Sequence, residues 1–163
     1  MFAGFVLFLA QELSIWWLLY IPFMSFARTA CNALDGMVAR ELKVKNQEFG
    51  EVLNEFFDRI SDAAIFFALA IASYTNIILG ASVTIFILLN SYLSIVSKAA
   101  GGSRQYKGIM GKADRMIYLG FMAVIILITK DYSWANYTLY FIGAGTIITT
   151  IQRFIYTKRE LYK

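Results

Sequence analysis

The sequence contains no histidine, a single cysteine and a single proline among its 163 residues. The lack of histidine removes the side chain that most often acts as a base near neutral pH, and also the commonest metal ligand. The lone Cys31 excludes an internal disulfide. Any acid–base chemistry must therefore fall to carboxylates, and any bound metal must be a hard cation held by oxygen.

Charged residues are also scarce, at 16%, whereas 59% of the chain is hydrophobic and the mean hydropathy is +0.60. This composition is typical of an integral membrane protein. We expect an all-α bundle of six transmembrane helices forming a single domain over residues 1–163. The apolar runs that predict them are 2–10, 14–27, 63–73, 77–97, 116–129 and 137–151. The first run is too short to span a bilayer, so that helix either continues through Gln11 and Glu12 or is truncated.

Basic residues gather on alternate connections of this predicted bundle. The segments 40–50 and 98–115 and the end of the chain are rich in lysine and arginine, whereas 74–76 and 130–136 hold only Lys130 and Asp131. The positive-inside rule therefore places the basic segments in the cytoplasm.

Seven carboxylates lie within residues 31–62, between two apolar runs, and most follow a helical period. One predicted helix face carries Arg28, Asn32, Asp35 and Ala39, and the next carries Glu51, Glu55, Asp58 and Asp62. Inward carboxylates are costly unless they are paired or bind a cation. Mg²⁺, Mn²⁺ or Ca²⁺ would suit them, and such ions at a cytoplasmic membrane face usually serve phosphate chemistry. The alternative is simple ion pairing with Arg28, Arg40 and Arg59.

Residues 32–40 read NALDGMVAR, and after nine further residues the chain continues as GEVLNEFFD, residues 50–58. This pattern resembles the signature of the CDP-alcohol phosphotransferase family, D-x2-D-G-x2-A-R followed by G-x3-D-x3-D. Asn32 stands at the first aspartate position and Asn54 at the third, and the spacer is one residue longer than is usual.

The resemblance implies a phospholipid-biosynthetic transferase that moves a phosphatidyl or phospho-alcohol group from a CDP-alcohol to a hydroxyl acceptor and releases CMP. It implies Asp58 as catalytic base and Mg²⁺ or Mn²⁺ as cofactor. The implied metal-site positions are Asn32, Asp35, Asn54 and Asp58, to which Asp62 and Glu55 could add compensating oxygens. The implied nucleotide-binding residues are Asp35, Gly36, Ala39, Arg40 and Gly50, and the implied acceptor-binding residues are Lys112, Arg115 and Arg153.

The expected partners are a CDP-alcohol lipid, a small polar or phosphorylated alcohol, membrane lipids and a second copy of the chain, with no nucleic acid. The expected location is a bacterial or archaeal plasma membrane, with the site facing the cytoplasm. For the basic residues, topology and anionic lipid headgroups are an alternative explanation.

The two asparagines halve the formal negative charge of the signature set, which should weaken binding of divalent ions severely. A catalytically silent family member that binds a nucleotide-lipid or a partner protein is therefore a second hypothesis. A small transporter is a third, although the acids cluster at one end and do not line a path.

Overall fold

The structure is a computed structural model that describes residues 14–41 and 47–162. Within these ranges only the backbone is described at positions 29, 32, 33, 35, 36, 38–41, 47 and 48. The described residues form a short 3-10 helix, η1, and five α-helices, and no strand occurs among them. The elements are η1 (Ile15–Leu19), α2 (Tyr20–Glu41), α3 (Gln47–Ile71), α4 (Ile77–Ala99), α5 (Lys112–Thr129) and α6 (Ser133–Leu161). The predicted helix over 2–10 lies outside the described residues.

The five other predicted helices are confirmed, but α2, α3 and α6 extend well beyond their apolar runs. The four-and-three spacing of polar residues in 28–39 and 51–62 already indicated that the helices continue there. Local signals mark where α4 begins and where it ends. The Asn76 side chain caps α4 by accepting from Ile78 N and Leu79 N at 3.0 and 3.1 Å. After α4 the chain turns at Gly101, whose φ of 92° favours glycine.

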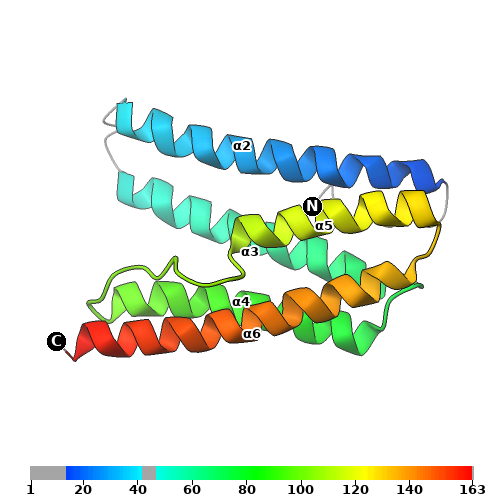
Figure 1. The fold of residues 1–163 in the computed structure, drawn as a ribbon. Helices are drawn as coiled ribbons and strands as arrows, with labels where there is room; N and C mark the ends of the chain where they lie inside the picture. Colours follow the sequence, from blue (N-terminus) through cyan, green and yellow to red (C-terminus); the bar gives the residue numbers. More distant parts are fainter. Residues whose placement is uncertain (1–13, 42–46, 163) are drawn as a thin grey trace.

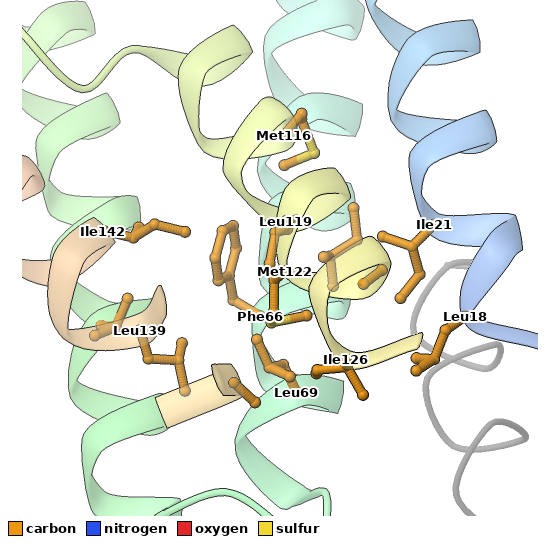
Figure 2. Close-up of a cluster of buried hydrophobic side chains, with 14 of the residues drawn as sticks. Leu18, Ile21, Phe66, Leu69, Met116, Leu119, Met122, Ile126, Leu139 and Ile142 are labelled. Carbon is orange, nitrogen blue, oxygen red and sulfur yellow. The ribbon is translucent and has the colours of Figure 1, made fainter. Parts of the chain in front are cut away.

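The helices lie alongside one another with α4 packed against α3 and α6, and α5 packed against α2 and α6 (Figure 1). A continuous apolar core joins them. Figure 2 shows Phe66 and Leu69 of α3 close to Leu119 and Met122 of α5, and the other helices add to this cluster. At one point α3 and α4 approach closely, because a Cβ at Gly80 would lie only 2.5 Å from the Cα of Ala70.

Among the described residues, only α4 is both long and apolar enough to qualify by itself as a membrane span. The number of spans expected from the sequence is therefore not established. The polar first half of α3 and the polar last turns of α6 explain in part why these two helices do not qualify, since they lower the mean hydropathy of otherwise apolar helices.

The basic segments share one end of the bundle. The last turns of α2, the first turn of α3, the start of the 100–111 connection and the end of α6 lie on the left in Figure 1, and the connection then runs back to α5 in the middle of the view. The opposite end is fastened by Asn136, whose amide donates to Tyr74 O at 3.0 Å and whose Oδ1 accepts from Asn76 N at 2.8 Å. The placement of the basic segments toward one end of the bundle is what the positive-inside assignment requires.

Candidate functional site

A cavity of about 290 Å³ opens near the basic end of the bundle, between α3, α4, α5, α6 and the 100–111 connection. Its lining residues are Asn54, Glu55, Asp58, Arg59, Ser91, Ser94, Arg104, Gln105, Tyr106, Gly111, Lys112, Arg115 and Arg153. The cavity therefore brings together one implied catalytic residue, one implied metal-site asparagine and all three implied acceptor residues, from the three helices α3, α5 and α6.

Asp58 lies on the cavity wall with cations around both carboxylate oxygens. Its Oδ1 contacts the Lys112 ammonium and lies 3.7 Å from Arg28 Nη2, and its Oδ2 lies 3.9 Å from Arg59 Nη2. The side chain is 13% exposed. The carboxylate is therefore within reach of a hydroxyl group that enters the cavity.

Asp62 lies one turn further along α3 and is fully buried. Arg28 Nη2 donates to its Oδ1 at 3.0 Å, and Arg115 Nη2 donates to its Oδ2 at 3.3 Å. Both oxygens are thus engaged by guanidinium groups. The metal-ligand role that the sequence suggested for Asp62 stays a prediction, and it would require an incoming cation to displace two arginines.

The cavity carries an excess of positive charge. Five of its lining side chains are lysine or arginine and two are carboxylates. The Arg115 guanidinium is 2% exposed, and its Nε and Nη1 are buried without a hydrogen-bond partner among the described residues. Buried donors of this kind are costly unless a ligand accepts from them. The site is therefore suited to an anion.

Arg153 also lines the cavity, but much of its guanidinium is used within the protein. Its Nε donates to Lys107 O at 3.1 Å and its Nη1 donates to Asn90 O at 3.0 Å. The residue thereby joins α6 to α4 and to the 100–111 connection. Among the implied acceptor residues, Lys112 and Arg115 face carboxylates while Arg153 holds two walls of the cavity together.

The α2 half of the site lies largely outside the described residues. This applies to the side chains of Asn32, Asp35, Ala39 and Arg40, and to the surroundings of Gly36. Gly50 is exposed in the first turn of α3, with open space where a side chain would be. A ligand could approach the backbone there.

The described residues alone do not make a divalent metal site. No group of three or more His, Cys, Asp or Glu side chains within them is arranged to hold an ion. Asn54 and Asp58 lie one turn apart and both line the cavity, so they fit one half of a ligand set. The other half would come from α2.

Several cavity-lining residues were not identified as site residues from the sequence, among them Arg104, Gln105 and Tyr106. These three lie on an irregular connection, where no periodicity indicates which side chains point inward. Arg28 was placed on the correct helix face, but its pairing with Asp62 spans 34 residues and has no local signal.

Comparison with known proteins identifies the family. The model of the CDP-alcohol phosphatidyltransferase family matches residues 1–156. The chain belongs to this family. The resemblance drawn from residues 32–58 is therefore confirmed. Members of the family are membrane phosphotransferases of phospholipid synthesis and in general depend on divalent metal ions.

Three relatives show the extent of the similarity. The chain is 30% identical over 147 residues to inner membrane protein YnbA of Escherichia coli, covering 90% of this chain and 72% of that protein. It is 31% identical over 134 residues to archaetidylinositol phosphate synthase of Pyrococcus horikoshii, covering 80% and 65%. An uncharacterized protein of Aquifex aeolicus is 31% identical over 136 residues, covering 80% and 64%. No solved structure matches the chain significantly.

Proposed function

We propose that this chain transfers a phosphatidyl or related phospho-alcohol group from a CDP-alcohol, such as CDP-diacylglycerol, to a hydroxyl acceptor and releases CMP. The supporting observation is that Asp58 lies on the wall of a cationic cavity in a chain of this family. The acceptor oxygen would form a bond to the β-phosphorus of the donor as the bond from that phosphorus to the CMP oxygen breaks. Asp58 would take the hydroxyl proton.

The donor would bind on the α2 side of the site. The nucleotide would contact Asp35, Gly36, Ala39, Arg40 and Gly50, and the open space at Gly50 supports close approach of a ligand to the backbone. Asp35 and Asp58, with amide oxygens from Asn32 and Asn54, would hold Mg²⁺ or Mn²⁺. The bound ion would offset the negative charge of the pyrophosphate.

The acceptor would enter the cavity beside Lys112, Arg115 and Arg153. The excess of cations and the unpartnered Arg115 donors favour an acceptor that itself carries an anionic group. Archaetidylinositol phosphate synthase is named for a phosphorylated product, which is in line with a phosphorylated alcohol as acceptor here. Arginine suits this role because its donors match phosphate oxygens in pairs.

In the cell we propose an integral protein of a bacterial or archaeal plasma membrane, with six spans and the site at the cytoplasmic face. The gathering of the basic segments at one end of the bundle supports this orientation. The chain would act as a single domain and as a homodimer among membrane lipids, without nucleic acid.

The test is CMP release from CDP-diacylglycerol by the purified protein with Mg²⁺ or Mn²⁺ and a panel of free and phosphorylated alcohols. Asp58→Asn should lower turnover by at least about 100-fold, the usual effect of losing a general base. Asp131→Asn is the matched control, because it makes the same change at an exposed aspartate between α5 and α6 that does not line the cavity. Equal turnover of the two variants would contradict a catalytic role for Asp58.

A second candidate function is a silent family member that binds a nucleotide-lipid or a partner protein. Asn32 and Asn54 at two signature positions are the observation in its favour. If the unmodified chain is inactive and the double variant Asn32→Asp with Asn54→Asp turns over, the scaffold has lost its chemistry. Activity in the unmodified chain would exclude the silent reading.

A further inference from the structure

Glu160, in the last turn of α6, accepts three hydrogen bonds from one short stretch of the 100–111 connection. Ser103 N donates to Oε1 at 2.8 Å, Ser103 Oγ donates to Oε2 at 2.9 Å, and Gln105 Nε2 donates to Oε2 at 2.7 Å. The carboxylate thus fastens an irregular segment to the end of a helix. None of these three bonds serves α6 itself.

The fastened stretch supplies part of the cavity wall. Arg104 lies between the two residues that Glu160 holds, and its guanidinium reaches Glu55 and lies 3.8 Å from Glu51 on α3. Gln105 is 5% exposed, and its carbonyl accepts from Ser94 Oγ on α4. Both Arg104 and Gln105 line the cavity, whereas Glu160 does not.

Two glycines with positive φ bracket this stretch. Gly101 has a φ of 92° and Gly108 a φ of 139°. Glycine loses more backbone freedom on ordering than any other residue, so the segment between them depends on its tethers for a defined position. Met110 N donates to Thr149 Oγ1 at 2.9 Å and Gly102 N donates to Ser97 O at 3.0 Å, which fixes the two ends. In the middle, Ser94, Ser97 and Arg153 bond to backbone carbonyls, and Glu160 binds the amide of Ser103 and the side chains of Ser103 and Gln105.

We propose that Glu160 is a positioning residue for the cavity: it holds residues 103–106 so that Arg104 and Gln105 stay on the wall facing the acceptor. This inference rests on the proposed function, in that it takes the cavity as the site of an anionic acceptor. Glu160 does not touch the ligand. It sets how tightly the anion is bound by keeping the Arg104 guanidinium and the Gln105 part of the cavity wall in place.

The test compares Glu160→Ala, Glu160→Gln and Ser103→Ala with Lys158→Gln in the full chain in detergent micelles. Lys158 is an exposed charge two positions earlier on α6, and its side chain takes no part in the three hydrogen bonds. Amide hydrogen exchange of residues 103–106 and the dissociation constant for inorganic phosphate are measured. If the chain turns over an acceptor, KM and kcat for that acceptor are also determined for each variant.

In Glu160→Ala we expect exchange at 103–106 to accelerate by about tenfold, as for the loss of one to two net hydrogen bonds, and the phosphate dissociation constant to rise by a similar factor. Glu160→Gln keeps one acceptor oxygen and Ser103→Ala removes one donor, so both should show smaller shifts. Lys158→Gln should match the unmodified chain. Any acceptor effect should fall on KM, with kcat unchanged.

Unchanged exchange in Glu160→Ala would overturn the proposal, and so would faster exchange with unchanged phosphate binding, since Glu160 would then fasten the connection without affecting the cavity. If amide exchange in Glu160→Ala is faster along the whole chain, that variant is globally destabilised. The same two criteria are then applied to Ser103→Ala. Both readouts work without turnover, so a chain that fails to release CMP contradicts the transferase proposal alone. Absence of phosphate binding in the unmodified chain would overturn this inference.

Discussion

Arg115 of α5 donates a hydrogen bond to Asp62 of α3 at 3.3 Å, and neither side chain is more than 2% exposed. Arg28 of α2 donates to the other oxygen of the same carboxylate. One buried anion therefore links three helices directly beneath the cavity. It offsets the charge of two arginines, of which Arg115 is buried and Arg28 is partly exposed.

Asp62→Asn should destabilise the bundle strongly, because it leaves the buried Arg115 guanidinium without its counter-charge and removes one of the two carboxylates beside Arg28. The expected loss is about 3 kcal/mol of unfolding free energy. The double variant Asp62→Asn with Arg115→Met should recover part of this loss, since the most deeply buried cation is then gone. Thermal unfolding in detergent measures both. A loss below about 1 kcal/mol in the single variant would mean that Asp62 is not the counter-charge of these arginines.

The sequence predicted five of the described helices and their order, because apolar runs bounded by polar or glycine residues are a local signal. It predicted less well where helices end. The polar halves of α2 and α3 carry no apolar run, and there only the spacing of residues such as Glu51, Glu55 and Asp58 indicated helix.

Part of the site could also be predicted, in this case from the family resemblance. Lys112, Arg115 and Arg153 were assigned to one pocket through the family resemblance, and the structure lines one cavity with all three. The sequence offered Arg28 as an ion-pairing partner for these acids, but the choice between a metal ion and arginines at Asp62, and the contact with Arg115, depend on how three helices pack. The role proposed for Glu160 could not be predicted from the sequence, because an exposed acid in a basic tail looks the same as an ordinary surface charge.

Gly80→Ala should destabilise the chain by about 1–3 kcal/mol, the usual cost of overpacking, because the new Cβ would meet the Ala70 backbone at 2.5 Å. Gly50→Ala is the matched substitution in an open position of α3, and it should leave stability equal or raise it by up to about 1 kcal/mol. Unfolding midpoints compare the two. Equal midpoints would show that the α3–α4 contact is able to relax.

Gly50→Ala also tests the nucleotide side of the site. If the donor lies against the backbone at Gly50, the variant should be stably folded and yet bind CDP at least about tenfold more weakly, since a methyl group would block close approach. Calorimetric titration with CDP measures this. Unchanged affinity for CDP would place the nucleotide elsewhere.

Arg153→Lys should loosen the junction of α6, α4 and the 100–111 connection, because an ammonium group cannot reproduce two donors in the fixed geometry of a guanidinium. The loss of one of the bonds to Asn90 O and Lys107 O should cost about 1–2 kcal/mol of stability. Arg159→Lys, an exposed position on the same helix, is the control. Thermal unfolding that does not distinguish the two variants would contradict the bridging role.

Acidic pH should open the contact between Glu160 and the 100–111 connection. The hydrogen bond from the Ser103 side chain, followed by those from Ser103 N and Gln105 and the charge of Lys107, holds the pKa of the Glu160 carboxyl below its usual value of 4.5. A lowered pKa means that the contact contributes fully above pH 4.5 and is lost as the pH falls through the lowered value. The protection factor of the Ser103 amide, corrected for intrinsic exchange, should therefore drop below pH 4.5 in the unmodified chain. In Glu160→Gln it should be lower at neutral pH and should change little over the same range, because no carboxylate remains there to titrate. Parallel curves for the two proteins would show that another group controls the position of this connection.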